Sequence, residues 1–289
     1  MTITSGFLER AAGRGPRLAY QLAVPERGAP RGAVFLTHGF GEHSARYGEV
    51  ITALTERELI VASYDLRGHG RSEGPRGHIE SFDDYLRDAD DLLAHLAGDE
   101  GWKAAGKPVL FGHSLGGLIS THVALAGQER FRGLAMTSPF FGLALQVPAI
   151  KKLLGRGMSR LFPRFAQPSG LSGAQLTHDR DIAERYDADP LGVKKVTARW
   201  FTETARAQER ALVEAPRLEL PLLCLAAGED IVASTPTTER FFDLAGSPDK
   251  ELRVLDGLFH EVLNEVDRAP HIAAVGDHIL GWVSGSAGH

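Results

Sequence analysis

One serine lies in a pattern that is typical of a catalytic nucleophile. Ser114 is the centre of Gly112-His113-Ser114-Leu115-Gly116, a G-x-S-x-G sequence between two apolar runs. Between a strand and a helix, this pattern predicts a sharp turn that exposes the serine. The start of the helix then offers backbone N–H groups and a dipole that favour a developing negative charge. Ser114 is therefore the predicted nucleophile.

A serine hydroxyl needs a neighbouring base, and the base needs an acid that orients it. Among the twelve histidines, His260 is the best placed, because a short loop separates it from the apolar run 252–255. Asp230 follows the run 222–226, and the adjacent Glu229 remains the alternative acid. The carboxyl ends of parallel strands meet at one edge of a sheet. The sequence therefore predicts a triad of Ser114, Asp230 and His260.

An oxyanion formed during attack by Ser114 requires two backbone N–H donors. The residue after the nucleophile, Leu115, supplies the first donor in sites of this kind. The second donor comes from the loop after an early strand, and the segment 37–41 ends the apolar run 33–37 in that position. The N–H of Phe40 is the predicted second donor.

The elements that position these residues alternate between short apolar runs and helical patterns. Six runs have the near-continuous apolar character of strands buried on both faces. They cover 33–37, 60–64, 109–111, 134–137, 222–226 and 252–255. This alternation predicts an α/β fold with a mostly parallel central sheet flanked by helices.

The alternation stops between residues 140 and 216. This stretch contains helical patterns separated by Pro163, Pro168 and Gly170, and no convincing strand. We expect a single structural domain whose core comprises 1–139 and 217–289, with 140–216 inserted as a helical cap.

Composition excludes several classes of protein. The 289 residues carry a net charge of −5 and have 43% hydrophobic residues, which argues against disorder and against nucleic-acid binding. Cys224 is the only cysteine, so no disulfide scaffold is possible. The sequence predicts neither a signal peptide nor a membrane-spanning run, and the expected location is the cytoplasm. The sequence leaves the oligomeric state open.

Metal and cofactor chemistry is not expected from the motifs. Asn264 stands where the second histidine of an H-E-x-x-H zinc motif would follow His260. No G-x-x-x-x-G-K and no strand-linked G-x-G-x-x-G pattern occurs. We therefore predict no metal and no cofactor.

Several blocks together resemble the monoacylglycerol lipase and lysophospholipase group of α/β hydrolases. They match in order and spacing from about residue 30 to residue 285. The blocks are 38–47, 64–74, 112–117, 186–191, 228–230 and His260-Glu261. The resemblance implies an α/β-hydrolase fold with a helical cap after the sixth strand. It also implies an esterase that acts on a single fatty-acyl chain, most readily a monoacylglycerol, through the triad named above.

Other activities remain open beside this one. A lysophospholipase, an acyl thioesterase or a general carboxylesterase would use the same triad, and only the shape of the pocket separates them. A remoter alternative is a noncatalytic binding module with a hydrolase fold, because the same fold can be kept after its original function is lost.

The resemblance also suggests residues for the polar headgroup. Glu42 and Arg46 match positions that lie near the glycerol end of the site in the monoacylglycerol lipases. The alternative is an ion pair that fixes the loop. The chain departs from the animal members at Leu263, where they have a second histidine, and at Ala233, where they have a cysteine. These departures leave the headgroup preference open.

A basic amphipathic helix is predicted inside the inserted segment. Residues 130–178 contain seven basic residues and no acidic one. Apolar residues recur there at helical spacing, and we expect them to form the acyl pocket or lid. They are Ile150, Leu153, Leu154 and Met158, followed by Leu161 and Phe162. Such a helix can lie on an anionic membrane surface; the alternative is a helix packed on the core with a solvated basic face.

Overall fold

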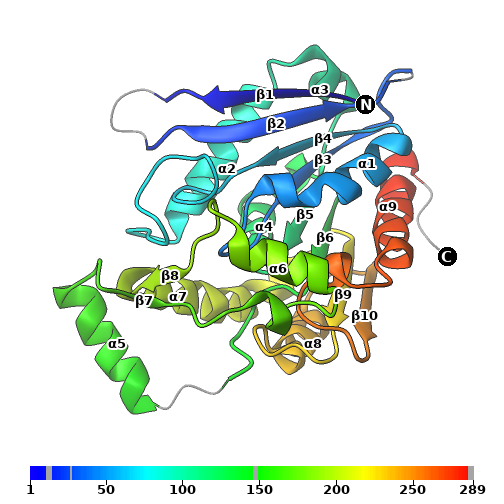
Figure 1. Cartoon of the computed structure of the whole chain (residues 1–289). Helices are drawn as coiled ribbons and strands as arrows, with labels where there is room; N and C mark the ends of the chain where they lie inside the picture. The colour runs from blue at the N-terminus through cyan, green and yellow to red at the C-terminus, as the bar shows by residue number, and fades with distance from the viewer. Residues whose placement is uncertain (11–14, 27, 146–148, 286–289) are drawn as a thin grey trace.

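The fold is built on one eight-stranded sheet with the order β1-β2-β4-β3-β5-β6-β9-β10 (Figure 1). A computed structural model describes residues 1–10, 15–26, 28–145 and 149–285. The strands are β1 (Thr2–Leu8), β2 (Leu18–Val24), β3 (Gly32–Thr37), β4 (Leu59–Tyr64), β5 (Val109–His113), β6 (Gly133–Thr137), β9 (Leu222–Ala227) and β10 (Lys250–Leu255). From β4 to β10 all neighbouring strands are parallel, which confirms the predicted α/β-hydrolase fold.

The six predicted strands are present, and five of them are buried along their whole length. These are β3, β4, β5, β6 and β9. The strand β10 is partly exposed because it forms an edge of the sheet. The prediction missed β1 and β2, which pair antiparallel to each other at the opposite edge. Most of β1 is exposed, so it lacks the apolar run that marks a buried strand.

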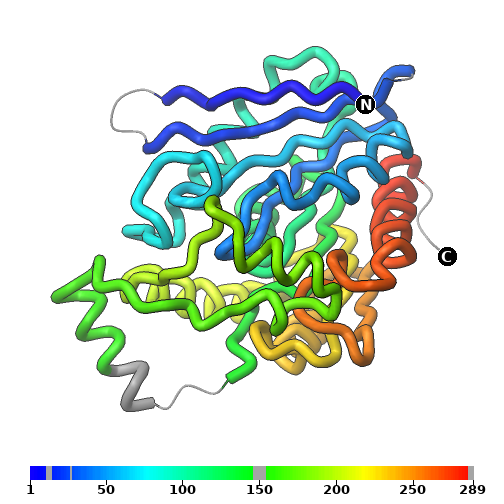
Figure 2. Tube along the Cα trace, in the orientation of Figure 1, coloured from blue at the N-terminus to red at the C-terminus, as the bar shows by residue number. Residues whose placement is uncertain are grey.

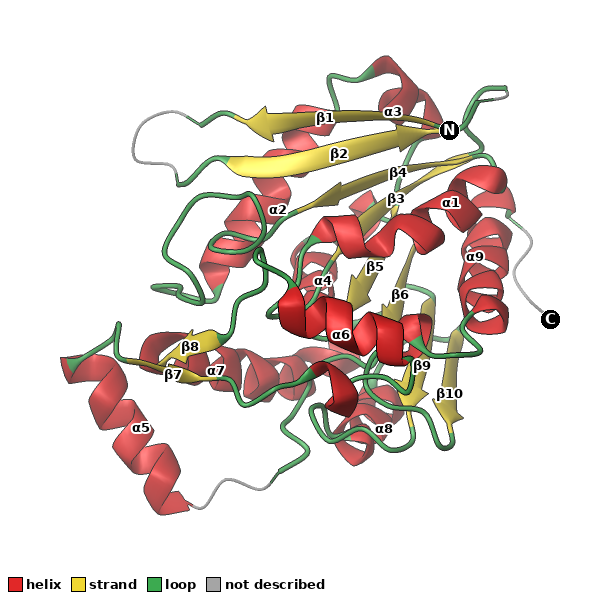
Figure 3. Ribbon diagram, in the orientation of Figure 1, coloured by secondary structure: helices red, strands yellow, loops and turns green. Residues whose placement is uncertain are grey.

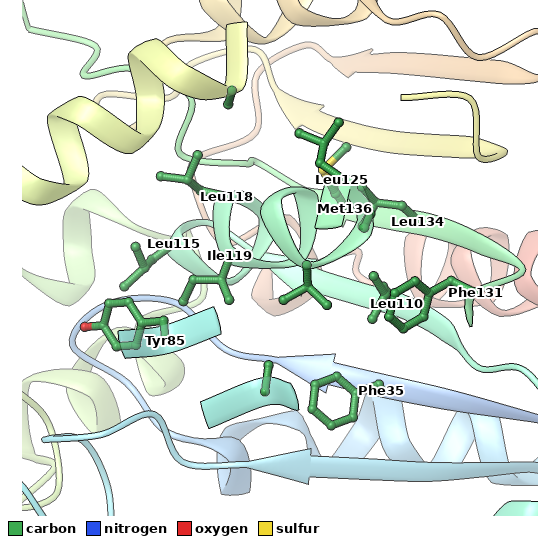
Figure 4. Packing of buried hydrophobic residues seen from close by; sticks show 14 of the residues in the cluster. Phe35, Tyr85, Leu110, Leu115, Leu118, Ile119, Leu125, Phe131, Leu134 and Met136 are labelled. Atoms are coloured by element: carbon green, nitrogen blue, oxygen red, sulfur yellow. The ribbon is translucent and has the colours of Figure 1, made fainter. Parts of the chain in front are cut away.

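Helices cover both faces of the sheet (Figure 3). The helices α1 (Gly48–Glu56) and α9 (Ala269–Ser284) pack together over one face. The helices α2 (Asp83–Leu96), α3 (Glu100–Ala105), α4 (Leu115–Ala126) and α8 (Thr235–Leu244) contribute to the apolar layer on the other face. Figure 4 shows Leu115, Leu118 and Ile119 of α4 among buried side chains from the sheet and from α2.

The described residues between β6 and β9 lie beyond the carboxyl ends of the strands (Figure 1, Figure 2). They contain the helices α5 (Ala149–Leu161), α6 (Arg180–Ala188) and α7 (Ala198–Glu214). The prediction that this stretch has no strand is wrong, because β7 (Ala166–Pro168) and β8 (Lys195–Thr197) pair antiparallel. Each has only three residues, too few for an alternating apolar pattern.

Within the described ranges, no helix combines the length and the apolar character that a membrane span requires.

The close contact between α4 and β3 determines where α4 begins. A β-carbon added at Gly116 would lie 2.0 Å from the carbonyl oxygen of Thr37 and 2.7 Å from that of His38. Both are backbone atoms that cannot rotate away. A glycine at position 116 therefore allows the first turn of α4 to lie against the end of β3.

We expect Gly116→Ala to destabilise the protein strongly, by more than the ~1–3 kcal/mol typical of an overpacked core, because backbone must move. The measurement is thermal unfolding followed by circular dichroism. The matched control is Gly155→Ala in α5, where nothing lies within 4 Å of the added carbon. Since glycine is unfavourable inside a helix by roughly 0.5–1 kcal/mol, this control is expected to be neutral or stabilising. Equal melting temperatures for the two variants would contradict the steric argument.

Candidate active site

Ser114 lies in a strained turn between β5 and α4. Its backbone has φ 52° and ψ −118°, a conformation that non-glycine residues rarely adopt. Backbone hydrogen bonds to the end of β6 and the residues after it hold this turn. The N–H of Ser114 donates to the carbonyl of Thr137 at 3.0 Å, and the carbonyl of Ser114 accepts from the N–H of Phe140 at 3.0 Å. Strain of this kind persists only where the surroundings fix it. The turn places the side chain of Ser114 at the carboxyl edge of the sheet.

The three residues of the predicted triad lie within hydrogen-bonding distance of one another. Nε2 of His260 is 2.9 Å from Oγ of Ser114, and Nδ1 of His260 is 2.6 Å from Oδ2 of Asp230. The second oxygen of Asp230 accepts from the backbone N–H groups of Val232 and Ala233. The alternative acid Glu229 is exposed. The arrangement can therefore pass a proton from Ser114 to His260 while Asp230 stabilises the resulting charge.

Burial and charge act in opposite directions on the titration of the triad. Burial alone would lower the pKa of His260, but the charge of Asp230 and the hydrogen bond to it outweigh burial, so the pKa is raised. Burial alone would raise the pKa of Asp230, but the attraction of His260 and the hydrogen bonds to the carboxylate lower it. The carboxylate thus stays charged while the imidazole remains a base of increased strength.

The two predicted oxyanion donors have free N–H groups. In the part of the chain that the structure describes, neither Phe40 nor Leu115 has a protein acceptor for its backbone N–H. The ring of Phe40 packs against Trp200 of α7, with centroids 4.5 Å apart, and against His69 at 5.3 Å. These contacts fix the residue that carries one donor.

Glu42 and Arg46 form a buried charged group beside the triad. One nitrogen of Arg46 lies 3.0 Å from Oε2 of Glu42, and its guanidinium makes two bonds of 2.7 Å to Glu261. Burial alone would raise the pKa of Glu42, but Arg46, the nearby histidines and the hydrogen bond from Tyr47 together lower it to about 2. Glu42 and Glu261 line the cavity next to Ser114, whereas Arg46 is not among the lining residues. Glu42 and Arg46 thus form the ion pair of the alternative interpretation, and their role toward a headgroup stays a prediction.

A cavity of about 380 Å³ opens beside Ser114 and His260. Its polar side contains Glu42 and Glu261, and most of the remaining wall is apolar. The apolar side chains include Phe140, Leu143, Val196, Trp200, Phe201 and Val232. Three of these six belong to β8 and α7, so the segment between β6 and β9 supplies much of the wall.

Two of the predicted acyl-pocket or lid residues, Leu154 and Met158, do not line this cavity. Leu154 is 62% exposed, and α5 packs against α7. A role of these two residues in a lid stays a prediction. Ile150 and Leu153 belong to α5, but their side chains lie outside the described residues.

Two acidic residues of the site were not assigned a role from the sequence. Glu261 pairs with Arg46, and its position next to His260 was the available signal. Glu265 is 2% exposed and accepts the backbone N–H of Phe259 at 2.8 Å and that of His178 at 3.0 Å. This carboxylate therefore ties the loop that carries His260 to the inserted segment.

The positions at which the chain departs from the animal lipases are buried. Leu263 is 7% exposed and packs in the apolar layer under α9, and Ala233 is 2% exposed. Neither lines the cavity, so neither contributes a polar group to it.

Comparisons with known proteins agree with this geometry. A family model described as serine aminopeptidase, S33, matches residues 28–267. The chain belongs to this family. Human monoglyceride lipase is 31% identical over 267 residues, which are 89% of this chain and 84% of that protein. Phospholipase YtpA of Bacillus subtilis (strain 168) is 32% identical over 242 residues, 83% and 91% of the two chains.

A lipase with a similar fold is among the solved structures. The crystal structure of Paleococcus ferrophilus monoacylglycerol lipase has a TM-score of 0.82 and 29% sequence identity, and the match covers 93% of this chain and 99% of that chain. The protein is thus a monoacylglycerol lipase-like α/β hydrolase, as the sequence motifs indicated.

We expect the rate at which a fluorophosphonate labels Ser114 to fall as the pH drops through the raised pKa of His260, because only the neutral imidazole accepts the serine proton. The acidic midpoint should lie above the ordinary histidine value. Asp230→Asn should move this midpoint down and slow labelling by about four orders of magnitude, since it removes the charge and favours the wrong tautomer. A midpoint that does not move in Asp230→Asn would contradict the assignment of the acid.

Proposed function

We propose that this S33 protein hydrolyses the ester of a single fatty-acyl chain, most readily a monoacylglycerol. The observation that carries the proposal is the hydrogen-bonded series Ser114–His260–Asp230 at the mouth of a mostly apolar cavity. An apolar cavity favours an acyl chain because burial of each methylene contributes about 0.8 kcal/mol. The relatives named as monoacylglycerol lipases support the same substrate class.

The proposed reaction has two halves. Oγ of Ser114 attacks the ester carbonyl while its proton moves to Nε2 of His260, whose Nδ1–H donates to Asp230. The N–H groups of Phe40 and Leu115 stabilise the oxyanion, and His260 then gives its proton to the departing alcohol. Water, deprotonated by the same histidine, next attacks the acyl-enzyme, and the proton returns to Ser114 as the fatty acid leaves.

The cavity favours an ester over the peptide that the family description suggests. An aminopeptidase must hold the charged α-amino group of its substrate, which requires an available carboxylate near the nucleophile. The two carboxylates of the cavity wall, Glu42 and Glu261, are both paired with Arg46. The neighbouring wall is apolar and offers an ammonium group no carboxylate of its own.

We place the glycerol end of the substrate against Glu42, whose carboxylate lines the cavity near Ser114. A carboxylate oxygen has more than one acceptor position, so Glu42 can accept from a hydroxyl while keeping its bonds to the protein. Arg46 would then act on the headgroup through Glu42 and Glu261, by holding both carboxylates in place.

We also propose that residues 140–216 act as a cap and that α5 brings it to anionic lipid surfaces. Figure 1 shows α5 at the periphery of the molecule, away from the sheet. Its described side chains include Leu154, Leu161 and the following Phe162, which are 62%, 72% and 60% exposed. Arg156 and Arg160 are exposed on the same helix. Apolar side chains beside cations are typical of helices that bind a membrane interface.

Hydrolysis of p-nitrophenyl esters and monoacylglycerols of increasing chain length tests the substrate class. The wild-type protein should prefer acyl chains of medium or greater length, and Ser114→Ala should lose on the order of a million-fold in rate. Val196→Phe should shift the preference to shorter chains, because a larger side chain then occupies the cavity wall. Hydrolysis of aminoacyl p-nitroanilides in place of esters would overturn the proposal. A preference for lysophospholipids over monoacylglycerols would instead favour the activity that the name of YtpA suggests.

Vesicle binding tests the role of α5. The double variant Leu161→Ser with Phe162→Ser should bind vesicles containing phosphatidylglycerol more weakly in a sedimentation assay. It should still hydrolyse short soluble esters at the wild-type rate, because neither residue lines the cavity. Val213→Ser is the matched control, since Val213 is 78% exposed on α7 and lies outside this cluster. Equal binding by all three proteins would show that α5 is not the lipid-binding surface.

A further inference from the structure

A single guanidinium connects the two loops that flank Ser114. The side chain of Arg46 is only 12% exposed and lies between Glu42 and Glu261, whose side chains are 3% and 4% exposed. The bonds to Glu261 are bidentate, which fixes the orientation of the guanidinium plane as well as its distance. The same group also lies over the ring of Tyr186 in α6, with its central carbon 5.1 Å from the centroid.

Glu42 carries this connection to the oxyanion loop. Its Oε1 accepts the backbone N–H of Gly39 at 2.6 Å and the hydroxyl of Tyr47 at 2.7 Å. Gly39 directly precedes the predicted oxyanion donor Phe40. A β-carbon at Gly39 would lie 3.1 Å from the β-carbon of Ser114, so the peptide that Glu42 holds is in contact with the nucleophile.

Glu261 carries the connection to the histidine loop. It is the residue after His260, and its Oε2 also accepts from the side-chain amide of Asn264 at 2.8 Å. Its backbone N–H donates to the carbonyl of Leu176 in the inserted segment at 2.9 Å. The side-chain bonds of Glu261 and the bond from its backbone N–H together fix the orientation of the peptide between residues 260 and 261.

We propose that Arg46 is a positioning residue for catalysis and that Glu261 is its essential partner, so that the bridge Glu42–Arg46–Glu261 sets the oxyanion donor and the catalytic histidine in one geometry around Ser114. The inference rests on the proposed serine chemistry but not on the identity of the lipid. A misplacement of about 1 Å at a reacting group can cost roughly 100-fold in rate. Lysine cannot replace the arginine, because an ammonium group does not provide the planar pair of donors that Glu261 requires.

The bridge also has an electrostatic consequence. Two carboxylates face one guanidinium, so the group keeps a net negative charge close to His260. The other titratable groups that face His260 are Asp230, which is bonded to it, and His113, whose ring centroid is 5.0 Å away. Burial lowers the pKa of His113, which favours its neutral form, so it adds little positive charge. Removing the charge of Glu261 should therefore destabilise the imidazolium that His260 forms during attack.

The test compares Arg46→Met, Arg46→Lys and Glu261→Gln with the wild-type protein. Arg57→Met is the matched control, because Arg57 pairs with Asp277 on the surface and does not line the cavity. Three quantities are measured: the rate of fluorophosphonate labelling of Ser114, kcat and KM for p-nitrophenyl octanoate, and the same constants for a monoacylglycerol. The p-nitrophenyl ester has no glycerol, so it separates positioning from headgroup binding. Thermal unfolding of each variant identifies any that do not fold.

We expect the labelling rate and kcat to fall by about 100-fold on both substrates in Arg46→Met, with KM for p-nitrophenyl octanoate changed less than threefold. Arg46→Lys should lose nearly as much, and Arg57→Met should lose nothing. In Glu261→Gln the acidic midpoint of the labelling rate should also move to lower pH, because a negative charge near His260 is gone.

A loss confined to KM for the monoacylglycerol would overturn the proposal and assign Arg46 to headgroup binding. Wild-type rates in Glu261→Gln would overturn it as well; this variant keeps the shape of the side chain, so it decides the question if Arg46→Met does not fold. If the wild-type protein is labelled but hydrolyses neither ester, the proposed function fails, while the labelling rates still test the bridge.

Discussion

The hydrogen bond between Asp230 and Nδ1 of His260 is the interaction on which the site depends. It fixes the tautomer of the imidazole and turns Nε2 toward Ser114. The three residues follow β9, β10 and β5, which lie close together in a parallel sheet. Because parallel strands end at the same edge, the strand order brings together residues that are distant in the sequence, and His260 lies 2.6 Å from Asp230 and 2.9 Å from Ser114. The order of the strands in the sheet therefore determines which residues meet in the site.

Buried charge is the second constraint, and it explains why the site extends beyond three residues. Asp230, Glu42 and Glu261 are nearly inaccessible to water, and each has a charged or strongly donating partner. A buried carboxylate without a partner would cost several kcal/mol or would take up a proton. Arg46 is a permanent cation and His260 becomes one when it takes the proton of Ser114, so the carboxylates and these two groups must be arranged together. Loss of any one group leaves another uncompensated.

The sequence predicted the parts of the structure that depend on local patterns. Buried strands, the glycine-bounded turn at Ser114 and the order of the triad residues all have such patterns. The pairing of Arg46 with Glu261 could not be predicted, because Glu261 lies 215 positions along the chain and only the folded sheet brings them together. The strand pair β7–β8 is too short to have a pattern of its own. The side chains of α5 have the periodicity of a packed helix, yet Leu154 faces water, because amphipathicity does not specify what the apolar face contacts.

Different stretches of chain encode the reacting groups and the cavity wall. The nucleophile, the acid and the base follow core strands, whereas Val196, Trp200 and Phe201 come from the segment between β6 and β9. Glu265 joins that segment to the histidine loop by accepting the backbone N–H of His178, and the backbone N–H of Glu261 donates to the carbonyl of Leu176. Any residue type other than proline can supply the N–H at position 178. Evolution can therefore exchange wall residues that do not contact the catalytic groups while the reaction is inherited unchanged. For the protein engineer, a library at Val196 and Phe201 that keeps Trp200, which packs against Phe40, would sample new substrate ranges without rebuilding the catalyst.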